Sequence, residues 1–170
     1  NALAISGLLQ TGYVGGPSVL PWQPEGYYAN LQFPKRKYVA SPAALRYRRS
    51  VYMHWQRTFL HPMLVNFDAP ARDECTADRT RSNSPQQALT LLNDPQFVEA
   101  ANAFAELVFD QSPGDDFASR LSDAYQRALS REPSEREVTQ LTEFYQAQRD
   151  RFRNAESDAK ALLTENGRPV

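Results

Sequence analysis

Helix-start signals, each followed by apolar residues at helical spacing, dominate the second half of this chain of 170 residues. Ser84-Pro85 and Asn93-Asp94-Pro95 each place a capping side chain before a proline, and residues 134–137 match a capping box. Three apolar stripes follow: Phe97, Ala101, Phe104 and Val108; Phe117, Leu121, Ala124 and Ala128; Val138, Leu141, Tyr145 and Phe152. The pattern predicts an all-α protein with helices near 85–92, 95–108, 115–128, 134–152 and 156–164.

The first half predicts fewer helices and one long connector. A first helix is expected to end near Gln10, because a run of glycines follows it. Residues 12–40 hold four prolines, which remove backbone donors, and several aromatic rings that can pin the segment to the core. A further helix is predicted to begin at Ser41-Pro42 and to end at Pro62. Its apolar stripe is Tyr47, Val51 and Trp55, extended by Tyr52 and Phe59, and a strand is the alternative for so short a span. Residues 66–83 are expected to be irregular and polar.

The expected architecture is an irregular helical bundle with a long Pro/aromatic-rich loop near the N-terminus. We expect residues 1–170 to form a single helical domain, with an extended loop at 12–40, a core at 41–110 and C-terminal helices at 115–165. The chain begins at Asn1 inside an apolar helical pattern, which suggests a fragment of a longer protein. The net charge is −1, so no global field favours nucleic acid, and no apolar run reaches the ~20 residues of a membrane span.

Charged side chains are concentrated around residues 46–81. The cluster comprises Arg48, Arg49, Asp68, Arg72, Asp73, Glu74, Arg79 and Arg81. Clustered carboxylates can form an acid/base or hard-metal centre, but arginines nearly balance them here. Arginine binds carboxylates through two hydrogen bonds, so the favoured interpretation is a structural network that ties the loop to its neighbouring helices. No catalytic residue and no metal site is predicted.

Other reactive side chains give weaker signals. His54 and His61 lack a third partner at metal-ligand spacing. Cys75 needs a nearby base to act as a nucleophile, and a buried structural thiol is the favoured interpretation. The absence of Cys-x-x-Cys-His excludes covalently attached haem, and no cofactor is predicted for this chain.

The aromatic connector gives a binding hypothesis. Trp22, Tyr27 and Tyr28 lie beside polar residues, an arrangement that can stack on sugar rings while hydrogen-bonding their hydroxyls. The alternative, which we favour at this stage, is that the rings hold the loop against the helical core.

Several longer motifs accompany these features. They are Gly16-Pro17-Ser18, Pro21 to Gly26, Arg48-Arg49-Ser50-x-Tyr52-x-x-Trp55, Phe67-Asp68-Ala69-Pro70, Arg72 to Cys75, and Asn83 to Pro95. Together they resemble a planctomycete-type family, the domain of unknown function 1553, over most of residues 1–110. Residues 131–137 are also similar. The resemblance implies the C-terminal part of a large exported protein that carries a cytochrome c domain elsewhere, and hence an extracytoplasmic location.

Three functions follow from these observations. The leading hypothesis is a non-catalytic interaction or scaffolding module whose partners are other domains of the same parent protein. The second is a polysaccharide- or sugar-binding module that uses the aromatic loop. The third is a hydrolase-type or metal-assisted enzyme centred on residues 68–74.

Overall fold

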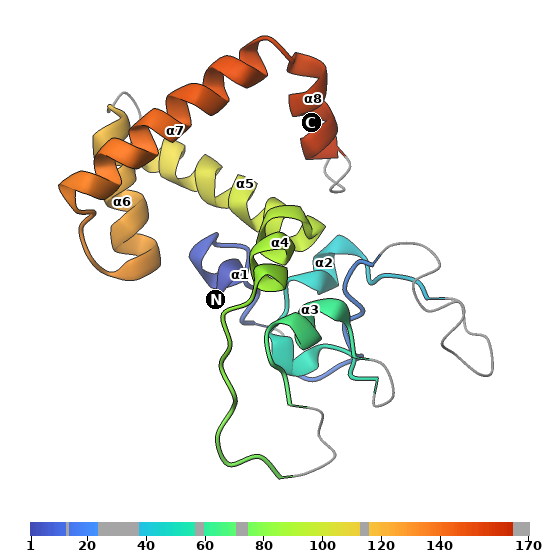
Figure 1. Ribbon diagram of the computed structural model, residues 1–170. Helices are drawn as coiled ribbons and strands as arrows, with labels where there is room; N and C mark the ends of the chain where they lie inside the picture. Colours follow the sequence, from blue (N-terminus) through green and yellow to red (C-terminus); the bar gives the residue numbers. More distant parts are fainter. Residues whose placement is uncertain (13, 24–37, 57–59, 71–74, 113–115, 165–170) are drawn as a thin grey trace. The chain divides into compact units, whose positions relative to one another are not determined.

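The computed structural model describes residues 1–12, 14–23, 38–56, 60–70, 75–112 and 116–164 (Figure 1). The helices within these ranges are α1 (Ala2–Ile5), α2 (Ala43–Arg46), the 3-10 helix η1 (Ser50–Tyr52), α3 (Pro62–Asn66), α4 (Pro85–Asn93), α5 (Pro95–Gln111), α6 (Phe117–Leu129), α7 (Glu135–Arg153) and α8 (Glu156–Thr164). Among the described residues, extended pairing is confined to the isolated bridges Gln10↔Arg48 and Val19↔Met53. The all-α prediction is confirmed.

The chain divides into two compact units. The terminal unit comprises Asn1–Leu8 and Val98–Val170, and the central unit comprises Leu9–Phe97. The terminal unit holds α1, most of α5, and α6 to α8, whereas the central unit holds the short helices and α4.

The terminal unit is built from long helices with a narrow apolar interior. α6 and α7 lie side by side, and the rings of Phe117 and Tyr145 stack between them with centroids 4.3 Å apart (Figure 1). Arg127 of α6 donates through Nε to the carbonyl of Ile5 at 2.8 Å, which attaches the end of α1. Gly7 turns the chain away there with φ +78, a region that favours glycine.

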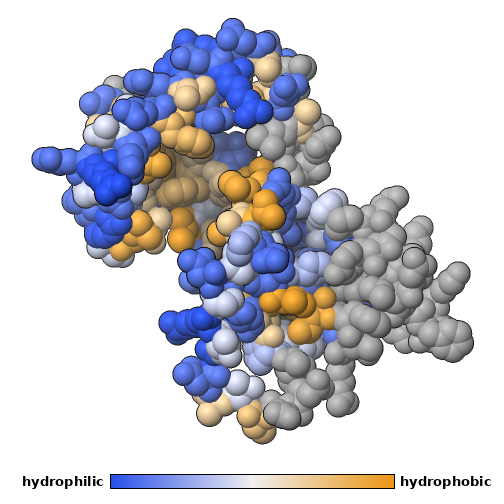
Figure 2. All heavy atoms as spheres, in the orientation of Figure 1, coloured by the Kyte–Doolittle hydropathy of each residue, from blue (hydrophilic) through white to orange (hydrophobic). Residues whose placement is uncertain are grey.

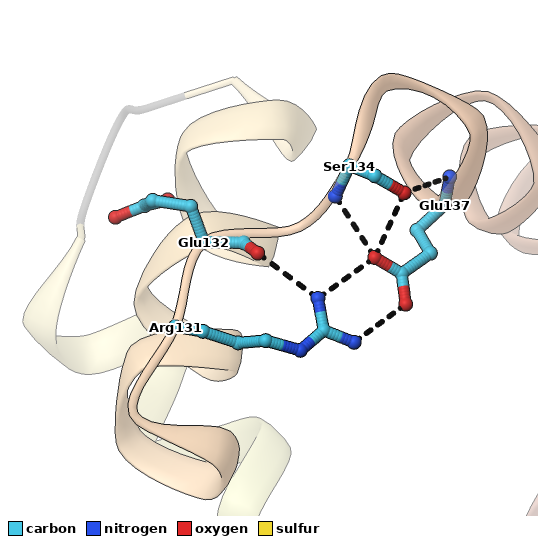
Figure 3. Close-up of polar contacts among 4 residues, drawn as sticks. All are labelled: Arg131, Glu132, Ser134 and Glu137. Atoms are coloured by element: carbon cyan, nitrogen blue, oxygen red, sulfur yellow. Dashed lines mark hydrogen bonds and ion pairs between the residues drawn. The ribbon is translucent and has the colours of Figure 1, made fainter.

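The start of α7 shows why these helices were predictable from local sequence. Ser134 caps the helix by accepting from the Glu137 N–H, while the Glu137 carboxylate accepts from the Ser134 N–H at 2.8 Å. The guanidinium of Arg131 donates two hydrogen bonds, of 2.9 and 2.7 Å, to the same carboxylate (Figure 3). These bonds lower the pKa of Glu137 and raise the pKa of Arg131. The capping-box prediction is confirmed.

The central unit depends on backbone pairing between distant segments. Gln10 N–H donates to the Tyr47 carbonyl at 2.9 Å, Val19 N–H donates to the Tyr52 carbonyl at 2.8 Å, and His54 N–H donates to the Val19 carbonyl at 2.7 Å. Two stretches of the N-terminal half therefore lie along residues 47–54. Tyr38 Oη donates to the Pro21 carbonyl at 2.6 Å, which joins the two described parts of the connector to each other.

Two helix predictions in the N-terminal half are wrong. The first helix ends at Ile5 instead of near Gln10, because Gln10 bonds with residue 47. Of the helix expected from 41 to 62, the described residues form only α2 and η1, since backbone groups of residues 47–54 bond with Gln10 and Val19. Ser41 Oγ accepts from the Leu20 N–H at 2.9 Å instead of capping α2. Pro62 begins α3 and does not end a helix.

Apolar side chains reach the surface of both units (Figure 2). Exposed examples are Leu89, Leu91 and Leu92 of α4 and Phe144 of α7. Of the helices in the described ranges, none combines the length and the apolar character that crossing a bilayer requires.

Candidate functional site

Arg48 holds the glycine-rich turn of the connector. Its side chain is only 3% exposed, and its guanidinium donates to the carbonyls of Pro17, at 2.8 Å, and Gly15. The same group lies 4.1 Å from the centre of the Tyr52 ring, and Tyr52 Oη accepts from the Gly15 N–H at 3.2 Å. The Gly-Pro-Ser motif and the Arg-Arg-Ser-x-Tyr motif therefore form one structural contact.

Asp68 organises the irregular segment before α4. Its carboxylate accepts from the Ser82 N–H at 2.8 Å, from Ser82 Oγ and from Gln87 Nε2 at 3.3 Å. Arg79 donates to the backbone carbonyls of Phe67 and Asp68, the latter at 3.0 Å. The hydrogen bonds from Ser82 lower the pKa of Asp68. Gln87 also completes the capping box of α4 with Ser84, so this network extends into the helix start.

Replacement of Asp68 by alanine should lower the midpoint of thermal unfolding. Alanine cannot accept these hydrogen bonds, and it would have to adopt φ 54, which disfavours residues other than glycine, asparagine and aspartate. Asp68→Asn keeps one acceptor and tolerates this φ, so its loss should be smaller. Circular dichroism melts should rank wild type, Asp68→Asn and Asp68→Ala in that order. The exposed Asp78→Ala is the control, and a midpoint for Asp68→Ala no lower than the control's would contradict this role.

The remaining predicted cluster residues are not gathered around Asp68. Arg49 and Arg81 are exposed, and Arg48 belongs to the glycine-rich turn. Arg72, Asp73 and Glu74 lie outside the described residues. In the described part of the cluster, Arg48 and Arg79 donate to backbone carbonyls. The sequence predicted arginine–carboxylate pairs, because the numbers of acidic and basic side chains nearly balance.

His61 is buried and serves as a helix cap. Its Nδ1 accepts from the Met63 N–H at 3.3 Å, which is the N-cap bond of α3. Because a backbone N–H only donates, the ring proton is assigned to Nε2, which lies 3.0 Å from the Trp22 carbonyl. Burial lowers the pKa of His61. Both ring nitrogens are thus engaged by backbone groups, and the imidazole anchors Trp22 to α3.

An open pocket of about 530 Å³ lies beside α3 and α4 in the central unit. Its less polar lining is Trp22, His61, Pro62, Met63, Leu89 and Pro95, and its polar lining is Gln23, Asn66, Gln86, Thr90, Asn93 and Asp94. The side chain of Asn66 donates to Thr90 Oγ1 at 2.7 Å, which joins the two helices. Trp22, 38% exposed, lines this pocket together with residues that carry amide and hydroxyl groups.

Two acceptors in this pocket have unusual surroundings. Gln23 Oε1 is buried and has no hydrogen-bond partner within the described ranges. Asp94 caps α5 by accepting from the Gln96 N–H at 2.9 Å, and its burial raises the pKa of the carboxyl group. An unsatisfied buried acceptor costs about 1–3 kcal/mol, and the accessible surface of this oxygen, below 1 Å², keeps it out of reach of a molecule in the pocket.

The sequence identified Trp22 but not the surface around it. Tyr27 and Tyr28 lie outside the described residues. The contribution of α3 and α4 was missed, although His61-Pro62 has the same cap-then-proline order as Ser84-Pro85 and signals a helix start.

The histidines and the cysteine do not form a common site. His54 is exposed, whereas His61 is buried. The prediction of a buried thiol is wrong, because Cys75 is exposed in the polar segment before α4. A search of the described part of the chain finds no group of three or more possible metal ligands.

Comparison with known proteins identifies a family without assigning a reaction. The family model PSD1, described as a protein of unknown function (DUF1553), matches residues 1–145. Neither a curated protein nor a solved structure matches the chain. Because the match covers most of the sequence, the chain belongs to the DUF1553 family.

Proposed function

We propose that the central unit is a non-catalytic carbohydrate-binding module whose binding site is the pocket beside Trp22. The observation that carries the proposal is the exposed Trp22 on a mainly apolar pocket of about 530 Å³, whose polar lining residues carry mostly amide and hydroxyl groups. An aromatic face packs against the C–H groups of a pyranose ring, while neighbouring polar groups bind its hydroxyls. A pocket of this size accommodates one or two sugar rings.

The placement of three ionisable groups, Asp68, His61 and Arg48, favours structural roles for them over catalysis. Asp68 accepts several hydrogen bonds, His61 uses both ring nitrogens, and Arg48 is directed at backbone carbonyls. Each group contributes to the fold of the central unit. A general base must instead be within reach of a substrate proton and able to accept it.

The experiment is a screen of neutral, amino and acidic oligosaccharides against the intact chain, followed by titration calorimetry of those that bind. Trp22→Ala should raise the Kd at least about tenfold, equivalent to about 1.4 kcal/mol. The expected loss comes from burial and stacking of one aromatic ring.

Phe144→Ala is the matched control, because Phe144 is another exposed ring and lies on α7 in the terminal unit. Its Kd should equal that of wild type. A screen without any binding sugar, or equal affinities for wild type and Trp22→Ala, would refute the proposal.

The leading hypothesis from the sequence, an interaction or scaffolding module, is compatible with sugar binding at this pocket. We propose that the pocket acts together with other domains of the parent protein, on the outer side of the cytoplasmic membrane, where polysaccharides are accessible. The resemblance to planctomycete proteins with cytochrome c domains supports this location. Fractionation of cells that express the parent protein tests it, and recovery in the cytoplasm would refute it.

A further inference from the structure

We propose that the pocket beside Trp22 selects sugars that carry a free amino group, with Asp94 pairing with the ammonium group. This inference rests on the proposed function and specifies its ligand class. It depends on the charge balance of the pocket wall, on the surroundings of Asp94 and on the acceptors that lie near the indole.

The pocket wall has one acidic side chain and no lysine or arginine among its described residues. The acidic side chain is Asp94, at the N-terminus of α5. His61 is neutral in its assigned hydrogen-bonding state and directs its Nε2–H at the Trp22 carbonyl. A uronate or sulfated sugar would bring negative charge toward a carboxylate without a compensating base, whereas an ammonium group would neutralise it.

Asp94 is partly removed from water, and the described residues provide no lysine or arginine to pair with it. The carboxylate is half-buried and accepts the capping bond from the Gln96 N–H. His61 is the charged or titratable neighbour that acts on Asp94, and burial favours its neutral form. A ligand ammonium would supply the missing opposite charge in a site that solvent screens incompletely.

The other pocket groups favour the same class of ligand. The indole face of Trp22 attracts cations as well as the C–H groups of a sugar ring. Asn66, Gln86 and Asn93 bring side-chain amides to the pocket lining. An amino sugar offers a ring face for Trp22, an ammonium group for Asp94 and hydroxyl groups for these amides.

The test compares three sets of oligosaccharides of equal length: glucosamine oligomers, their N-acetylated counterparts, and oligomers that contain glucuronate. Calorimetry is done at a pH where the amines are protonated and Asp94 is ionised. Wild-type protein should bind the glucosamine oligomers at least about tenfold more tightly than the N-acetylated set. The glucuronate set should bind most weakly.

The matched variant is Asp94→Asn. Asparagine is as good an N-cap as aspartate, so α5 keeps its first turn while the pocket loses its charge. The variant should lose the preference for free amines, so that it binds the glucosamine oligomers and their N-acetylated counterparts with similar affinity. Wild type and Asp94→Asn should have similar melting curves, which would show that the lost preference does not result from unfolding.

The outcomes separate this inference from the proposed function. If the three sets bind equally, or if Asp94→Asn keeps the preference, the inference fails while carbohydrate binding remains. If no oligosaccharide binds, the proposed function fails. Lysine amide serves as a competitor without a sugar ring, and competition as strong as that of glucosamine oligomers would overturn the assignment to amino sugars.

Discussion

Replacement of Arg48 by alanine should destabilise the central unit by about 3 kcal/mol. The guanidinium is almost completely buried and donates to the carbonyls of Gly15 and Pro17. Its removal takes away two hydrogen bonds from a charged donor, worth about 1.5–3 kcal/mol each, and the contact with the Tyr52 ring. Because Gly15 and Pro17 are exposed, water replaces part of the lost bonding and keeps the sum near the lower end of this range.

Urea denaturation monitored by tryptophan fluorescence measures this loss, because both tryptophans lie in the central unit. Arg49→Ala is the control, since the adjacent arginine is exposed and should change stability by less than about 0.5 kcal/mol. Arg48→Lys should lie between wild type and Arg48→Ala, because an ammonium group cannot reach both carbonyls in the same planar geometry. Equal stability of the two alanine variants would refute the anchoring role of Arg48.

Replacement of His61 by alanine should cost about 2–3 kcal/mol. The N-cap bond of α3 accounts for about 1 kcal/mol, and the unpaired Trp22 carbonyl for about 1–3 kcal/mol, part of which hydration recovers. His61→Asn can keep the cap but not the contact with Trp22, so its loss should be smaller. Chemical denaturation at neutral pH measures both values, and losses below about 0.5 kcal/mol for both variants would contradict the role of His61.

His61 should also make stability depend on pH. Burial lowers its pKa from the ordinary value of 6.5. A group with a depressed pKa in the folded state stabilises the protein above its unfolded pKa, and this contribution is lost as pH falls through the folded pKa. Stability of the central unit should therefore decline as pH drops below 6.5. His61→Asn should remove this part of the decline, whereas His54→Gln should keep it.

Asp94 must be controlled in that experiment. It faces His61, and burial raises its pKa, so its contribution to the pH dependence has the opposite sign. The two histidine variants are therefore compared in an Asp94→Asn background. A decline that is the same with and without His61 in that background would contradict the assignment.

The sequence was informative where local contacts decide the structure. α4, α6 and α7 begin with caps that use side chains at most three residues away, and all were predicted near their observed positions. Residues 47–54 carry an equally good helical stripe but are mostly not helical. Their backbone groups bond with Gln10 and Val19, 33 to 37 residues away in the chain, and such long-range pairing leaves no local signature.

The candidate site shows the same division. Trp22 was predicted because of its residue type, and Arg48 and Asp68 because of their charge. Their partners were not predicted, since those are largely backbone carbonyls and a serine brought together by the fold. The sequence marks Asp94 only as the start of a helix. The pocket beside its carboxylate is partly formed by α3, a helix that was not predicted from the sequence.

The most direct test of the account is a proton–nitrogen NMR titration of the two indole Nε1–H signals with a glucosamine oligomer. The chain has two tryptophans, and a spectrum of Trp22→Phe assigns both signals. Trp22 lines the pocket, whereas Trp55 is not among its lining residues. We expect a saturable shift of the Trp22 signal and little change of the Trp55 signal. No shift of either signal at saturating sugar, or a shift of Trp55 alone, would contradict it.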